Sequence, residues 1–418
     1  MFKKAYLENG MPVIMEQIKN VRSVALGIWV KVGSRNEPPG KNGISHFLEH
    51  MFFKGTQKRS ARDIAVDTDS FGGDLNAFTS RESTTFYIKV LDEYFDRGIE
   101  LLSDIFLHST FPEDDIEKEK GIVKEEIKLV EDTPDDYIHD LFNHTIWGNE
   151  GVGQPVLGRK ETIKSFKRED LINHIKRYYG TKDTVISCAG NFEADKLLAM
   201  LNHSLGSLRK GLEPEKGPQP VFKGGSKVYS KELSEVHLCV GVEGIPQASN
   251  DRYVLFLLNT ILGAGVSSRL FQEIREKRGL VYSIYSYVTS YFDTGVWAIY
   301  AGTGRKKITE VIELILKELK ELSATLTDVE LQRAKNQLKG NLILGLESTS
   351  SRMQNIARQE IYYGRYYSPS EIIKEIEAIT LRQVKELSEK LIGQKNIALT
   401  VLGPVHENDM KGILDYSK

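Results

Sequence analysis

The sequence has few cysteines, no long apolar run and almost no net charge. Cys188 and Cys239 are the only two cysteines in 418 residues, and each lies in an apolar, strand-like segment. Two such thiols fit buried, reduced side chains better than a disulfide, and they favour a reducing compartment. Lys and Arg number 56 against 58 Asp and Glu, which leaves a net charge of -2. Without a basic excess, the composition implies neither nucleic acid nor an anionic membrane surface as a partner.

Hydrophobic residues occur in short runs throughout the chain. No segment approaches the ~20 apolar residues of a membrane-spanning helix, and no apolar run of signal-peptide length follows Met1-Phe2-Lys3-Lys4. We therefore expect a soluble protein of the bacterial or organellar interior, with a cytoplasmic location as the assignment. A chain of 418 residues is long enough for two or more domains, each with its own core.

The segment His46-Phe47-Leu48-Glu49-His50 carries the clearest chemical signal. Read as a helix, it places His46 and His50 one turn apart on the same face, with Glu49 beside them. Two imidazoles at this spacing can bind one zinc ion, and the carboxylate can accept a proton from a metal-bound water. The acid precedes the second histidine, which is the inverted H-x-x-E-H order. An ordinary amphipathic helix is the alternative interpretation.

A catalytic zinc site needs a third protein ligand besides water, and a helix predicted over residues 117–131 offers one. Glu119 and Glu126 are seven residues apart and therefore project from one face of that helix, whereas Glu125 points elsewhere. We predict Glu126 as the third ligand and Glu119 as a neighbour that orients a histidine through its other ring nitrogen. In so charged a segment, either acid alone would more often be a solvated surface residue.

Together these segments resemble the insulinase and mitochondrial processing peptidase family of zinc metallopeptidases, in its single-subunit bacterial type. The resemblance covers essentially the whole chain and is carried by Gly43–Thr56, by Gly72–Glu82 and by the helix with the two acids. Glu126 follows His50 by 76 positions, the separation that this family shows between its second histidine and its glutamate ligand.

The resemblance implies a zinc endopeptidase that hydrolyses unfolded peptides or presequence-like segments. One Zn²⁺ per chain is then held by His46, His50 and Glu126. Glu49 acts as general base toward a zinc-bound water, whose pKa falls to ~7.

Two further segments gain a role from the resemblance. Family members use an arginine and a tyrosine seven residues later to hold the substrate carbonyl, and Arg275 and Tyr282 match that spacing. A guanidinium and a phenol are suitable donors to the oxyanion of a tetrahedral intermediate; a capped basic helix end is the alternative. Asn76, Ala77 and Phe78 read as an edge strand, which the resemblance places beside the zinc. An extended substrate could add there as a further strand; a merely structural edge strand is the alternative for Thr79 and Ser80.

The chain is also an internal repeat. Val24–Val30 matches Val236–Val242, and Ile175–Phe192 matches Ser388–Val405. Each half interleaves β-rich runs with amphipathic helices, so we predict an α+β protein of two homologous domains. Each is expected to be a mainly antiparallel sheet with helices packed on one face.

A segment rich in proline, glycine and charge divides the two halves. We predict a zinc-bearing domain over 1–208, a linker over 209–225 and a homologous domain over 226–418 that carries the Arg/Tyr pair. Aligning the halves shows that the second has lost every residue of the metal site: Val254, Leu257 and Leu258 stand opposite His46, Glu49 and His50, and Ala334 and Asn341 stand opposite Glu119 and Glu126.

The resemblance also bears on assembly, because the chain corresponds to half of a clamshell. We predict a homodimer that encloses a chamber with two composite sites, each with zinc from one subunit and Arg275 and Tyr282 from the other. One rival function is a catalytically silent core subunit of the same family, but such chains typically lose part of the His/Glu set. Another is a zinc hydrolase for small molecules, which would not need an edge strand.

Overall fold

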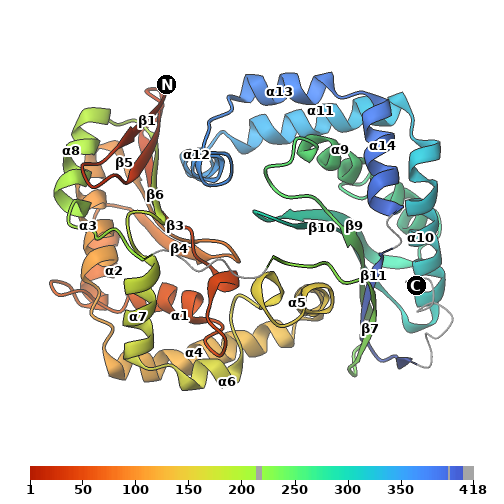
Figure 1. Cartoon of the computed structure of the whole chain (residues 1–418), viewed down its shortest axis with the longest axis horizontal. Coiled ribbons are helices and arrows are strands. Elements are labelled where there is room, and N and C mark those ends of the chain that lie inside the picture. Colours follow the sequence, from red (N-terminus) through yellow and green to blue (C-terminus); the bar gives the residue numbers. More distant parts are fainter. Residues whose placement is uncertain (213–218, 394–395, 408–418) are drawn as a thin grey trace. The chain divides into compact units, whose positions relative to one another are not determined.

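The computed structural model describes residues 1–212, 219–393 and 396–407. The chain forms two compact units (Figure 1). The first unit comprises Met1–Leu129, Glu150–Pro218 and Gly345–Tyr366, and the second comprises Val130–Asn149, Gln219–Leu344 and Tyr367–Lys418. Neither unit is a continuous stretch of sequence, because each takes a helix from the half of the chain that mainly builds the other. Within the predicted linker, residues 213–218 lie outside the described residues.

A six-stranded sheet forms the centre of the first unit. Its order is β1-β2-β6-β3-β5-β4, and only the β2–β6 pair is parallel. The expected edge strand is therefore confirmed as β4, which among the described strands pairs only with β5. The strands are β1 (Phe2–Tyr6), β2 (Pro12–Gln17), β3 (Ser23–Val30), β4 (Asp74–Thr79), β5 (Thr84–Leu91) and β6 (Thr184–Gly190).

Side-chain alternation along β3 assigns a core to each face of this sheet. Val24, Leu26 and Ile28 point into the larger core, whereas Ala25 and Trp29 point to the opposite face. The larger core is closed by α1 (Ile44–Phe52), α2 (Ala61–Ser70), α3 (Phe95–His108), α4 (Glu113–Glu131), α6 (Lys160–Ser165), α7 (Arg168–Tyr178) and α8 (Ala194–Leu205).

The opposite face of the first sheet is covered by α12 (Thr349–Tyr363), which comes from the second half of the chain (Figure 1). Met353 and its neighbours pack on Trp29, and Arg352 pairs with Glu16 at 2.6 Å. At the crossing point β3 carries Gly27, where an added Cβ would lie 2.6 Å from the sulfur of Met353. The glycine therefore permits the close approach of the helix.

The second unit repeats this architecture. Its sheet order is β7-β11-β8-β10-β9, which corresponds strand by strand to β2-β6-β3-β5-β4, and again one pair is parallel. The predicted internal repeat and the α+β class are confirmed. The strands are β7 (Gly225–Ser230), β8 (Val236–Glu243), β9 (Val281–Ser290), β10 (Gly295–Thr303) and β11 (Ala398–Gly403).

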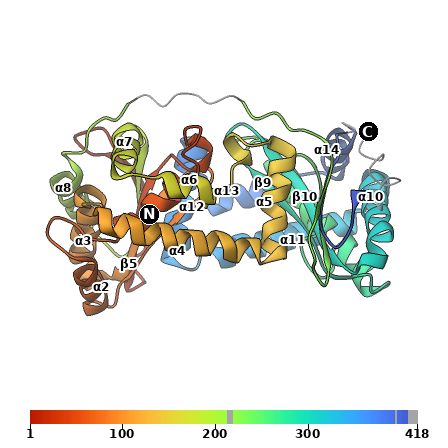
Figure 2. The same ribbon diagram turned by 90° about the horizontal axis from the view of Figure 1, so that it is seen from below.

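Most helices of the second unit also lie on one face of its sheet: α9 (Arg252–Leu262), α10 (Ile308–Thr325), α11 (Asp328–Gly345), α13 (Pro369–Ala378) and α14 (Leu381–Ile392). The other face carries α5 (Pro134–Trp147), from the first half of the chain (Figure 2). His139 on this helix hydrogen-bonds the hydroxyls of Tyr285 and Tyr287 on β9, at 3.1 and 3.0 Å. The sequence predicts helices on one face of each sheet. The structure adds one helix on the opposite face of each, α12 in the first unit and α5 in the second. Among the described residues no helix is long and apolar enough to cross a membrane.

Candidate metal centre

The helix that carries both histidines is anchored at its N-terminus by a buried acid. The Glu37 carboxylate accepts hydrogen bonds from the backbone nitrogens of Gly43 and Ser45 at 2.7 and 2.9 Å, and from the side chain of Asn42 at 2.9 Å. Those backbone groups are donors that a helix leaves unpaired at its start. Burial raises the pKa of Glu37 to about 7, although these hydrogen bonds act to lower it. Glu37 thereby fixes the start of α1.

His46 and His50 lie on the same face of α1, with ring centroids 4.6 Å apart. The Oε2 atom of Glu126, on α4, lies 3.9 Å from His46 Nε2 and 3.6 Å from His50 Nε2. One ligand atom from each residue falls within 4.8 Å of the others. The structure therefore brings together the three residues that the sequence nominates as ligands.

The chemical state of this triad suits a divalent metal. Glu126 Oε2 is buried and has no hydrogen-bond partner among the described residues, although it faces two ring nitrogens. Burial, reinforced by the neighbouring His50, lowers the pKa of His46 to about 3, so this imidazole is neutral at pH 7. Neutral imidazole nitrogen and carboxylate oxygen are the donors that zinc accepts. A zinc ion between the three groups would satisfy an oxygen that otherwise lacks a partner.

Glu119 contacts the other ring nitrogen of His50. Its Oε1 lies 2.7 Å from His50 Nδ1, and its Oε2 lies 2.6 Å from the Lys54 ammonium. Burial acts to raise the pKa of Glu119, but the hydrogen bonds from His50 and Lys54 outweigh burial and the pKa is lowered. Glu125 points away, with a side chain 78 % exposed. These positions are those expected from the helical spacing.

Glu49 lies between the two histidines in sequence and contacts the edge strand. Its Oε2 accepts a hydrogen bond of 2.6 Å from the hydroxyl of Thr79, the last residue of β4. Burial raises the pKa of Glu49, against the lowering effect of that hydrogen bond and of His50. Sequence reasoning missed Thr79, because a threonine in a β-rich run is common and its partner is 30 positions away.

The three predicted substrate residues of β4 do not all face the same way. Successive strand side chains alternate, so Ala77 and Thr79 share the face toward α1, where Ala77 is part of the larger core. Phe78 lies on the other face, edge-on to Trp29 with ring centroids 5.5 Å apart. Asn76 shares that face and accepts a hydrogen bond from the backbone nitrogen of Ala77 at 2.8 Å. Only the backbone of this segment, with the Ala77 and Thr79 side chains, is directed toward α1.

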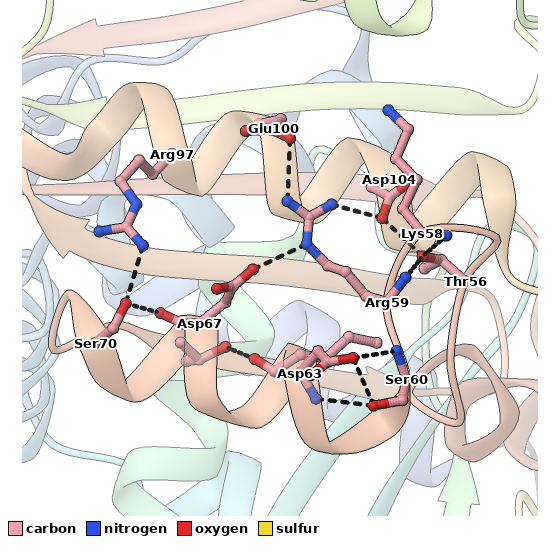
Figure 3. A network of polar contacts seen from close by, with 12 residues as sticks. Thr56, Lys58, Arg59, Ser60, Asp63, Asp67, Ser70, Arg97, Glu100 and Asp104 are labelled. Carbon is pink, nitrogen blue, oxygen red and sulfur yellow. Dashed lines mark hydrogen bonds and ion pairs between the residues drawn. The ribbon is translucent and has the colours of Figure 1, made fainter.

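The loop that follows α1 is held by a network centred on Arg59 (Figure 3). The guanidinium contacts Asp67 on α2 at 2.9 Å, and Glu100 and Asp104 on α3 at 3.0 and 2.7 Å. Asp104 also accepts a hydrogen bond from the Thr56 hydroxyl at 2.8 Å. The loop after the histidine helix is thereby tied to both following helices.

Arg275 and Tyr282 lie in the second unit. Arg275 is in the π-helical turn Phe271–Glu276, with its guanidinium 4.8 Å from the centroid of the Phe271 ring. Tyr282 is the second residue of β9 and is 65 % exposed. Their role toward a substrate stays a prediction.

Comparison with known proteins tests the family resemblance of the sequence. The profile described as insulinase (peptidase family M16) matches residues 12–160, and the profile described as peptidase M16 inactive domain matches residues 165–338. The chain is 42 % identical over 405 residues to a Bacillus subtilis protein named uncharacterized zinc protease YmxG, covering 97 % of this chain and 98 % of that protein. The chain belongs to the insulinase family, peptidase family M16.

A second relative and two solved structures match over similar lengths. An uncharacterized zinc protease of Streptomyces coelicolor is 35 % identical, over 99 % of this chain and 92 % of that protein. A protease from Helicobacter pylori has a TM-score of 0.89 at 24 % identity, over 97 % of this chain and 100 % of that chain. A chain of Complex III2 from Candida albicans has a TM-score of 0.87 at 23 % identity, over 99 % of both chains. At these identities the two structures establish the shared fold.

Proposed function

We propose that this member of the insulinase family is a zinc-dependent endopeptidase that acts on unfolded peptides or presequence-like segments. The observation that carries the proposal is that His46, His50 and Glu126 lie close together, and that the buried Glu126 Oε2 has no hydrogen-bond partner among the described residues. Glu49 stands beside them with its carboxylate held by Thr79. Names given to the curated relatives, which are called zinc proteases, support the same chemistry.

In the proposed hydrolysis each side chain of the site has a separate role. A zinc ion, when bound, supplies an acidified water and polarises the scissile carbonyl. His46 and His50 present ring nitrogens, and Glu119 fixes the ring of His50 from its far side. Glu49 takes the proton from the attacking water and later delivers it to the leaving amine. The raised pKa of Glu49, caused first by burial, makes its carboxylate a stronger proton acceptor.

The proposed substrate is an extended peptide, because β4 lies at the edge of the first sheet and β5 is its one partner in the part of the chain that the structure describes. A peptide can pair with such an edge through backbone hydrogen bonds, with little demand on its own sequence. Thr79, at the end of β4, donates to Glu49, so a peptide aligned along this edge passes beside the base. Asn76, Ala77 and Phe78 are proposed to contribute mainly through their backbone.

The proposal is tested with a quenched library of unfolded peptides and a metal analysis. Glu49→Gln should lower turnover by ~100-fold or more, the scale for loss of a general base, while about one zinc per chain remains bound. Glu125→Gln is the matched control, since its exposed side chain should leave both quantities unchanged. Loss of zinc in Glu49→Gln would make Glu49 a ligand instead. Zinc binding without hydrolysis in the wild type would favour the silent core subunit.

We also propose the homodimer, with Arg275 and Tyr282 of one subunit serving the zinc of the other. The test mixes Glu49→Gln protein with Arg275→Ala protein under conditions that allow subunit exchange. A mixed dimer then contains one site with an intact base and an intact arginine, so part of the activity should return. Demonstrated exchange without recovery of activity would instead place both groups in one chain.

A further inference from the structure

A continuous chain of polar contacts runs from the predicted metal site to a lysine outside it. The Nδ1 atom of His50 lies 2.7 Å from one oxygen of Glu119, and the Lys54 Nζ atom lies 2.6 Å from the other oxygen. Both oxygens of the acid are thus engaged, one by the ring and one by the ammonium. No part of the hydrolysis derived above uses Lys54.

The electrostatics of Glu119 explain why a cation is needed there. The residue is 2 % exposed, and a buried charge costs several kcal/mol unless it is paired and hydrogen-bonded. A neutral His50 that binds a metal through Nε2 donates a hydrogen bond through Nδ1 but contributes no charge of its own. Lys54 supplies the compensating charge, and its side chain, 30 % exposed, reaches the acid from the surface.

The backbone around Lys54 is placed to hold this contact. Lys54 follows His50 by four positions, one helical turn, and its backbone nitrogen donates to the Met51 carbonyl at 3.2 Å. Two residues later Thr56 begins the loop that is tied to α3 through Asp104 (Figure 3). The ammonium therefore projects from a constrained segment.

The second unit provides an internal comparison. When Gly55 is aligned with Gly263, Leu262 stands opposite Lys54 and is fully buried. When Phe111 is aligned with Leu326, Ala334 stands opposite Glu119 and is 2 % exposed. The lysine and the acid have thus been lost together.

A second lysine, Lys120, has a lysine as its counterpart in the second unit, unlike Lys54. Lys120, next to Glu119, is matched by Lys335, and the two are 8 % and 7 % exposed. Lys120 donates to the Glu117 carboxylate at 2.6 Å, and Lys335 donates to the Glu377 carbonyl at 2.7 Å. A buried lysine of structural type persists in both units, whereas Lys54 occurs only where a metal site is predicted.

We propose that Lys54 is a positioning residue for the metal site: it holds and neutralises the Glu119 carboxylate, which in turn orients His50 toward the ion. The inference rests on the proposed function only in that the site binds zinc. Lys54 touches neither metal nor substrate, so its effect is measured as metal affinity.

The experiment measures zinc affinity by competition with a chromophoric chelator at fixed pH. Lys54→Met should weaken binding by about tenfold, the lower end of the range for groups that orient a metal ligand. Lys54→Arg keeps the charge and should restore most of the affinity. Lys118→Met is the matched control, since Lys118 is 72 % exposed and pairs with Asp115 on the same helix; its affinity should equal that of the wild type.

A double-mutant cycle with Glu119→Gln shows whether the lysine acts through the acid. In the Glu119→Gln background, Lys54→Met should change zinc affinity less than about twofold, because coupled residues are not additive. An equal loss in both backgrounds, or no loss in either, overturns the proposal. Lys54→Gln, checked for folding by circular dichroism without metal, replaces Lys54→Met if that variant does not fold. Wild-type protein that binds no zinc would refute the proposed function itself, whereas normal binding by Lys54→Met would refute this inference alone.

Discussion

The two sheets share the order of five strands, but the helix at one equivalent position carries polar residues in the first unit and apolar residues in the second. In the first unit α1 presents His46, Glu49 and His50 beside α4. In the second unit α9 presents Val254, Leu257 and Leu258, with exposures of 5 %, 0 % and 0 %, as part of the apolar core. The position is therefore one that this architecture can pack with hydrocarbon alone.

The fold does not require the polar side chains of α1, because their counterparts on α9 are apolar. Buried polar and charged groups cost free energy unless they are fully paired, and the second unit avoids that cost. The strand ladders also align Thr79 with Val288, which packs against the second core. The donor to Glu49 is thus lost along with its acceptor. This set of polar residues, present in one unit alone, supports the proposed metal site.

The largest effect is expected when four residues of the metal site are replaced by their apolar counterparts from the second unit. A variant with His46→Val, Glu49→Leu, His50→Leu and Glu119→Ala should bind no stoichiometric zinc, because only one of three ligands remains. Its metal-free form should unfold at a temperature equal to or above that of the metal-free wild type, since buried polar groups are replaced by apolar ones. Metal analysis and calorimetry measure both. A lower unfolding temperature would mean that the polar set is also structural.

The next effect separates Glu119, Glu125 and Glu126, three of the acids on α4. Glu126→Gln should remove most zinc affinity, and Glu119→Gln should weaken it by roughly 10–100-fold, the cost of losing a group that orients a ligand. Glu125→Gln should leave it unchanged, because its side chain is exposed. A zinc titration in which Glu125→Gln is the most damaging change would refute the assignment by helix face.

A smaller effect is expected at Thr79, whose counterpart is Val288. Thr79→Val should lower kcat by about tenfold or more with little change in KM, because a hydrogen bond to a charged group contributes about 1.5–3 kcal/mol. Thr79→Ser keeps the hydroxyl and should retain most of the rate. If the valine and serine variants were equally slow, the methyl group and not the hydrogen bond would matter.

The smallest effect concerns pH and the start of α1. The folded-state pKa of Glu37, raised by burial to about 7 from 4.5, means that folded protein holds a proton that the unfolded chain releases. Glu37 therefore contributes stability that is present below about pH 4.5 and is lost as pH rises to about 7. Metal-free wild type should lose stability relative to Glu37→Gln over this window. In thermal unfolding at several pH values, a constant difference between the two proteins would argue against the raised pKa.

Much of the site was predictable because its geometry is local. His46 and His50 are one helical turn apart and Glu119 and Glu126 two turns apart, so helical periodicity alone placed each pair on one face. The contacts from Thr79 to Glu49 and from Lys54 to Glu119 join separate elements, and no spacing rule predicts them. The repeat predicted that the two halves share one architecture, whereas the strand order itself came from the structure.

The exchange of helices between the two halves could not be predicted from the sequence. The α5 and α12 segments have amphipathic patterns that would suit packing against any apolar face. Periodicity shows that a helix has an apolar side, but not which sheet receives it. The swap therefore became apparent only from the contacts of Met353 with Trp29 and of His139 with Tyr285 and Tyr287.

That exchange has a consequence for synthesis of the chain on the ribosome. The sheet beside the metal centre keeps Trp29 and its neighbours uncovered until α12 has been translated, and α12 ends at Tyr363 of 418 residues. Domains usually fold in order as they emerge, N-terminal first. Here the nascent N-terminal half already contains His46, His50 and Glu126 but lacks the helix that seals its sheet. The sheet that supports the site is therefore covered on both faces only after α12 has been made.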